Sequence, residues 1–109
     1  MGTIKSSREI DTIFRDAKRV AQSLLTVLVA RTPEGRGRSG RVAFIAGKKL
    51  GGAVLRNRNR RVLRESVHRV GGPWAGWDVV LIARTTTAAA RPEALDRALA
   101  SALTRAGVA

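Results

Sequence analysis

A chain of 109 residues has the length of one domain and can bury a modest hydrophobic core. It contains no cysteine, which excludes disulfides and thiolate metal sites and fits a reducing compartment. The net charge is +13, and all but four of the 21 cationic residues are arginine, which grips phosphate with two parallel hydrogen bonds. We therefore expect a single domain over residues 1–109 that binds a polyanion.

No segment predicts a membrane association. The longest strongly apolar run, Leu24 to Ala30, is too short to cross a bilayer. The N-terminal residues lack the long apolar stretch of a signal peptide and contain two acids, Glu9 and Asp11. We expect no membrane partner and a cytoplasmic location.

The first half of the chain predicts one helix and two strands. Ser6 to Ala17 reads as a helix, because Ser6 and Glu9 fit a capping box and apolar residues follow at helical spacing. Leu24 to Ala30 and Arg41 to Ala46 are short apolar runs that read as strands. The polar, glycine-rich loop between them indicates that these two strands form an antiparallel pair.

The second half predicts a helix, a strand and a last helix. The first of these helices begins near Gly51 or Gly52 and ends at about Val70, before a Gly-Gly-Pro sequence. Trp77 to Ala83 is a strongly apolar strand, and Pro92 suits the first turn of a helix that ends at Gly107. The order α-β-β-α-β-α predicts an α+β sandwich with helices packed on one small mixed sheet.

Catalytic groups are scarce. The chain has one histidine, His68, and neither a phosphate-binding loop motif nor a pair of neighbouring carboxylates accompanies it. Nucleophilic and metal-assisted catalysis need several such groups to converge. We therefore expect no catalytic residue, no protein-bound metal and no organic cofactor.

The segment from Lys48 to Arg69 is strongly basic. It holds eight cations against one acid, Glu65. Arginines four apart on a helix repel one another, so this arrangement does not serve local stability, whereas a nucleic acid would relieve the repulsion. Asn59 falls in the apolar stripe of this helix, and we expect its amide to be hydrogen-bonded or near solvent.

The same segment carries a pattern of glycines, cations and an asparagine, Lys48-Lys49-x-Gly51-x-Ala53-Val54-x-Arg56-Asn57-Arg58-x-Arg60-Arg61-x-x-Arg64-Glu65. This pattern resembles the signature of the protein subunit of bacterial ribonuclease P. The strands Arg41 to Phe44 and Trp77 to Arg84 and the helix from Glu9 to Ala17 resemble their counterparts in that family, in the same order.

The resemblance implies a fold and a role. The fold would contain a left-handed strand–helix–strand crossover around the signature helix. The protein would bind ribonuclease P RNA, one protein per RNA subunit, and would contact the 5′ leader of precursor tRNA. The RNA subunit would cleave the leader with Mg²⁺, which it would itself bind in the main.

The resemblance also assigns residues. Eight positions of the signature would contact RNA: Lys48, Lys49, Arg56, Asn57, Arg58, Arg60, Arg61 and Arg64. Ile10 and Phe14 on the first helix would line the leader cleft, where Ile10 replaces the aromatic residue usual in the family. Phe14 would then supply most of the stacking on bases.

Two other functions fit the charge. A structural ribosomal-type protein that binds rRNA would be equally small and basic. A DNA-binding module could place the basic helix in the major groove, although the strand order argues against a helix-turn-helix. The signature favours ribonuclease P over both.

Overall fold

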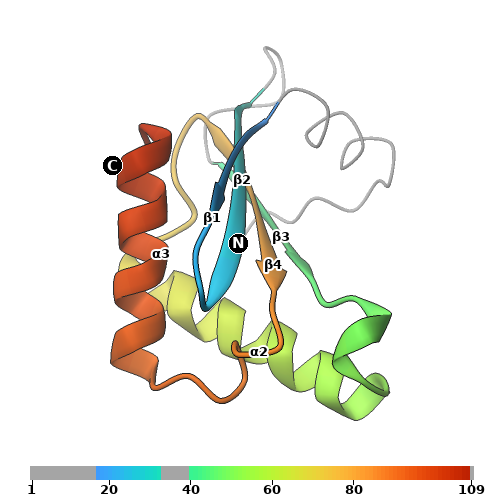
Figure 1. The fold of residues 1–109 in the computed structure, drawn as a ribbon. Helices are drawn as coiled ribbons and strands as arrows, with labels where there is room; N and C mark the ends of the chain where they lie inside the picture. The colour runs from blue at the N-terminus through green and yellow to red at the C-terminus, as the bar shows by residue number, and fades with distance from the viewer. Residues whose placement is uncertain (1–16, 33–39, 109) are drawn as a thin grey trace.

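The computed structural model describes residues 17–32 and 40–108. In chain order the elements are β1 (Lys18–Ala21), β2 (Leu25–Arg31), β3 (Arg41–Ile45), the 3₁₀ turn η1 (Lys48–Leu50), α2 (Ala53–Val70), β4 (Trp77–Ala83) and α3 (Pro92–Ala106) (Figure 1). The predicted α+β class is confirmed. The predicted first helix lies outside the described residues, apart from Ala17 at its end.

The four strands form one mixed sheet in the order β1-β2-β4-β3. β4 pairs antiparallel with β2 and parallel with β3. The predicted antiparallel pairing of the strands at 24–30 and 41–46 is therefore wrong, because β4 lies between them. The physical reason is the apolar character of β4 on both faces: Val79, Val80 and Leu81 are fully buried, which only a central strand allows.

The sequence did not reveal β1. A tight turn joins this strand to β2, with which it pairs antiparallel, and Val20 is its one buried residue. A single buried residue among four gives no detectable period, and an exposed, charged strand is typical of a sheet edge.

The unit β3–α2–β4 is a crossover between two neighbouring parallel strands. In the view of Figure 1 both strands run downwards, β4 lies to the left of β3, and α2 passes behind the sheet. The crossover is accordingly left-handed, as the resemblance implied and against the usual right-handed rule.

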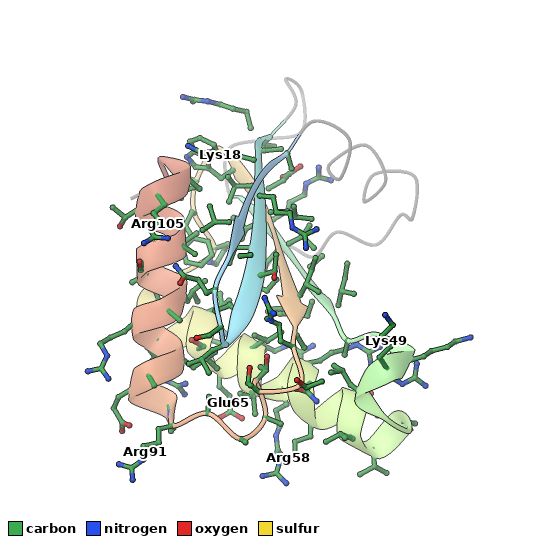
Figure 2. All side chains as sticks on the ribbon, in the orientation of Figure 1. Lys18, Lys49, Arg58, Glu65, Arg91 and Arg105 are labelled. Atoms are coloured by element: carbon green, nitrogen blue, oxygen red, sulfur yellow. The ribbon has the colours of Figure 1, made fainter. Side chains whose placement is uncertain are left out.

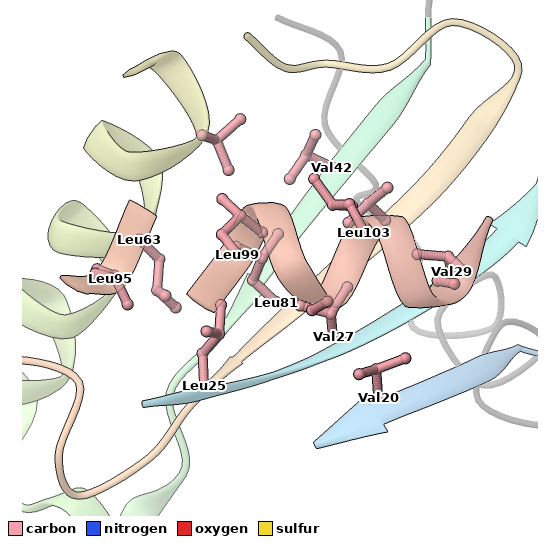
Figure 3. Packing of buried hydrophobic residues seen from close by; sticks show 14 of the residues in the cluster. Val20, Leu25, Val27, Val29, Val42, Leu63, Leu81, Leu95, Leu99 and Leu103 are labelled. Carbon is pink, nitrogen blue, oxygen red and sulfur yellow. The ribbon is translucent and has the colours of Figure 1, made fainter. Parts of the chain in front are cut away.

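Both helices pack on the same face of the sheet and form the main core. Leu63 and Val67 of α2, and Leu95, Leu99 and Leu103 of α3, meet alternate residues of the strands (Figure 3). The core sits between α3 and the β1–β2 side, and between α2 and the β3–β4 side. The helices therefore keep their outer surfaces free for other contacts.

A buried ion pair fixes the start of β3 and β4. Asp78 is 1% exposed and receives hydrogen bonds from Arg41 Nε at 3.0 Å and Arg41 Nη2 at 2.6 Å, and from the Thr32 hydroxyl at 3.1 Å. Arg41 and Asp78 are also register partners across the parallel pair. Since an unpaired buried charge is costly, this contact favours one register.

Both tryptophans have structural roles. Trp77 packs against the core at the start of β4, as expected from its strand period, with the Arg31 guanidinium 4.7 Å from its ring centre. Trp74 is half-buried and lies against Gly40, where a Cβ would stand 2.2 Å from the Trp74 carbonyl oxygen. Gly40 has φ +78°, so both its conformation and this close approach require glycine.

Candidate nucleic-acid interface

The basic segment begins at the exposed turn η1 and continues into α2. Lys48 and Lys49 are exposed, and Lys49 points away from the protein in Figure 2. Gly51 has φ +122°, so the turn itself requires glycine there. Gly52 has an ordinary φ and open space around it, so the fold does not require its missing side chain. The first N–H groups of α2 are therefore open to solvent on this side.

The buried and exposed residues of α2 lie on different faces of the helix. One stripe is buried and contains Asn59, Leu63, Ser66 and Val67. The remaining positions up to Arg64 carry five of the arginines together with Asn57, and within α2 the single acid is Glu65. The helix thus anchors one stripe in the core and presents cations on the others.

A row of arginines four residues apart runs along the flank nearest β3. Arg56 and Arg60 are half-buried and Arg64 is exposed. The Arg64 guanidinium lies 5.3 Å from the ring centre of Phe44 on β3, a cation–π contact that holds the side chain at the sheet edge. Arg56 Nε is buried with no hydrogen-bond partner among the described residues.

The outward face carries Asn57, Arg58 and Arg61, all exposed. Arg60 Nη1 donates to Asn57 Oδ1 at 2.9 Å, which orients the amide. Arg61 Nε lies 3.6 Å from Glu65 Oε1, an exposed pair worth little in water. The structure therefore brings all eight sequence-predicted RNA contacts onto one continuous element, η1–α2, on two adjoining surfaces.

Arg69, which the sequence places in the same basic run, has a different environment. Its guanidinium donates to both carboxylate oxygens of Asp96 on α3, at 2.8 and 3.1 Å, and the Ser66 hydroxyl donates to Asp96 Oδ1 at 2.6 Å. The hydrogen bonds from Arg69, and then that from Ser66, hold the pKa of Asp96 below its ordinary value. Arg69 thus ties α2 to α3, a pairing over 27 residues that no local pattern could predict.

Asn59 is 2% exposed, and its Nδ2 donates to the Leu55 carbonyl one turn earlier at 2.9 Å. The amide nitrogen is hydrogen-bonded as expected, and Asn59 lies on the buried stripe where the predicted helical register places it. Its Oδ1 is buried and has no partner among the described residues.

The predicted leader-cleft residues, Ile10 and Phe14, lie outside the described residues. Within residues 17–32 and 40–108, no group of three or more His, Cys, Asp or Glu could hold a metal ion. In the same part of the chain, no helix has the length and apolar character needed to cross a membrane.

Comparison with known proteins defines the class. The family model for ribonuclease P matches residues 2–107. The ribonuclease P protein component of Brevibacillus brevis is 32% identical over 110 residues, covering 96% of this chain and 82% of that protein. The component from Dehalococcoides mccartyi strain 195 is 46% identical over 68 residues, covering 62% of this chain but only 56% of the relative.

Solved structures agree with the fold. The RNase P protein of Staphylococcus aureus superposes with a TM-score of 0.82 at 26% identity, covering 99% of this chain and 97% of that one. The RNase P protein of Thermotoga maritima superposes with a TM-score of 0.77 at 23% identity, covering 96% of this chain and 97% of that one. The fold defines a class of small α+β proteins in which a left-handed crossover contains a basic helix. The chain belongs to the ribonuclease P protein family.

Proposed function

We propose that this chain is the protein component of ribonuclease P, which binds the RNA subunit and assists removal of the 5′ leader from precursor tRNA. The observation that carries the proposal is the surface of η1–α2, where cations stand on exposed faces of a helix that is anchored in the core. Family membership favours this function over the ribosomal-type alternative.

The residues on this surface suit a role in binding and orientation. Arginine and lysine contacts to phosphates supply affinity and fix the register of an RNA, without reading its sequence. Open N–H groups at Gly52 and the following residues would add donors for a phosphate at the start of α2. In keeping with a binding role for these residues, we assign the hydrolysis, and the Mg²⁺ that it uses, to the RNA subunit.

The test is reconstitution. The purified protein is mixed with a bacterial ribonuclease P RNA and a precursor tRNA, at a Mg²⁺ concentration where the RNA alone is slow. We expect the protein to accelerate cleavage at the mature 5′ end. Tight RNA binding without acceleration, for substrates with and without a leader, would contradict the proposal and support a ribosomal-type protein.

A further inference from the structure

The first turn of α2 exposes an apolar side chain that the fold does not use. Val54 is 86% exposed, and Leu55 is the other exposed large apolar residue of the described chain. Leu55 lies against Gly51, but Val54 projects on the side of the helix away from the core. A β-branched residue is a poor helix former and gains nothing from exposure. Val54 is therefore open to contact with a partner.

Val54 lines a hollow together with three polar residues of the same helix. The hollow is shallow and open to solvent, and it is lined by Val54, Asn57, Arg58 and Arg61. These positions are spaced i, i+3, i+4 and i+7, so they share the outward face of α2. A single apolar side chain is thus surrounded by an amide and two guanidinium groups.

The polar groups around Val54 have hydrogen-bond donors that the described chain does not use. Asn57 Oδ1 is used by Arg60, and its NH₂ group has no acceptor among the described residues. Arg58 likewise has no hydrogen bond or ion pair within this part of the chain, and it points outward in Figure 2. Arg61 keeps a loose, exposed contact with Glu65, which a phosphate can replace.

The partner must offer an apolar face and negative charge together. A second copy of this chain would bring more cations to a surface already rich in them, which repulsion opposes. A regular duplex offers phosphates but keeps its base faces stacked inside. An unpaired nucleotide offers the face of its base and its phosphates at once.

We infer that this face of α2 binds an unpaired nucleotide of the RNA, with Val54 packed on the base. The Asn57 NH₂ group donates to an acceptor on the base edge, and Arg58 and Arg61 bind the flanking phosphates. The inference rests on the proposed function, because the RNA that binds α2 supplies the nucleotide. It adds a contact to the base itself, which phosphate binding alone does not provide.

The first experiment compares Val54→Ala, Val54→Thr and Val54→Lys with the wild type for affinity to ribonuclease P RNA over a series of salt concentrations. Val54→Ala should weaken binding roughly tenfold without changing the salt slope, as expected for lost apolar burial. Val54→Thr keeps the shape and should also weaken binding. Val54→Lys should weaken binding at high salt, whereas a purely phosphate-binding face would bind more tightly.

The second experiment locates the nucleotide. Single abasic substitutions are made in RNA positions that the protein protects, and each is tested with wild type and Val54→Ala. We expect one position at which base removal weakens the wild type but has no further effect on the variant. Additive losses at every position would overturn the inference.

The failures of the two proposals are distinguishable. If the wild type neither binds nor stimulates the RNA, the proposed function fails. If the wild type binds and stimulates while all three Val54 variants match it, the inference alone fails. A wild-type dimer that Val54→Ala dissociates, with RNA affinity unchanged, would also overturn it. Val54 is exposed and no variant removes a core contact, so thermal stability should not fall and serves as the control for folding.

Discussion

Asn59 shows how a single side chain limits the stability of the signature helix. Its amide nitrogen is satisfied by the Leu55 carbonyl, but its buried oxygen has no partner in the described part of the chain. Such a group costs about 1–3 kcal/mol. Asn59→Leu, which has a similar volume, should therefore raise the free energy of unfolding by about 1 kcal/mol and the Tm by about 4–8 °C.

Asn57→Leu is the matched control, because that amide is exposed and the change removes no buried polar atom. It should leave the Tm nearly unchanged and instead weaken RNA binding. A lower stability for Asn59→Leu, measured by thermal or urea unfolding, would contradict the expected gain from removing the unpaired Asn59 oxygen.

The two adjacent glycines before α2 differ in what they do. Gly51 adopts a φ of +122°, which other residues rarely adopt, whereas Gly52 has an ordinary backbone and no neighbour within 4 Å of a Cβ. The turn therefore explains Gly51 alone. Gly52 leaves room at the start of the helix, which is consistent with the close approach of a phosphate.

At the scale of elements, the contact between α2 and α3 depends on Asp96. Arg69 and Ser66 lower the pKa of Asp96 from its ordinary 3.8, because their hydrogen bonds favour the carboxylate. The folded state then binds fewer protons than the unfolded state near this pH. The stabilisation is present above the ordinary pKa and is lost as the pH falls through the lower folded value.

Asp96→Asn should therefore reduce stability at neutral pH and flatten its decline between about pH 5 and pH 2. Urea unfolding across that range measures both effects. Glu93→Gln is the control, since Glu93 is exposed on the first turn of the same helix and has no hydrogen bond or ion pair in the described chain. If the stability of wild type and of Asp96→Asn fell equally with decreasing pH, the proposed role of the Asp96 carboxylate would be contradicted.

At the scale of the whole molecule, the charge of +13 attracts RNA from any direction. Exposed arginines lie on two different helices, so the general attraction of the net charge can be tested separately from direct contact at α2. Arg56, Arg60 and Arg64 form the row on α2 beside β3. Arg91, Arg97 and Arg105 are exposed on or beside α3, and Figure 2 shows Arg91 and Arg105 far from Lys49.

Replacing the three arginines of the α2 row with alanine should weaken RNA binding and reduce its salt slope by about three, one per lost phosphate contact. The matched α3 variant loses the same charge and should change the slope far less. Filter binding or fluorescence titration over a salt series measures both. Equal slopes for the two variants would show that overall charge, rather than the α2 surface, sets the affinity.

Of the described elements, the sequence by itself determined α2, α3 and three of the four strands, because apolar residues recur at the periods of 3.6 and 2 that each element needs. α2 was predicted within two residues of its observed start and ended where observed, and β4 matched from Trp77 to Ala83. The basic surface followed as well, since charges four apart on a helix share a side wherever the helix lies.

Tertiary structure alone decided what depends on contacts between distant residues. The order of the sheet was one such feature, because β4 enters between two strands that precede it and buries both its faces. The hydrogen-bonded pairing of Arg69 was another, because Asp96 contacts it only when α3 packs against α2. The exposure of Val54 was a third, because a sequence names an apolar residue but only packing shows that the core left it outside.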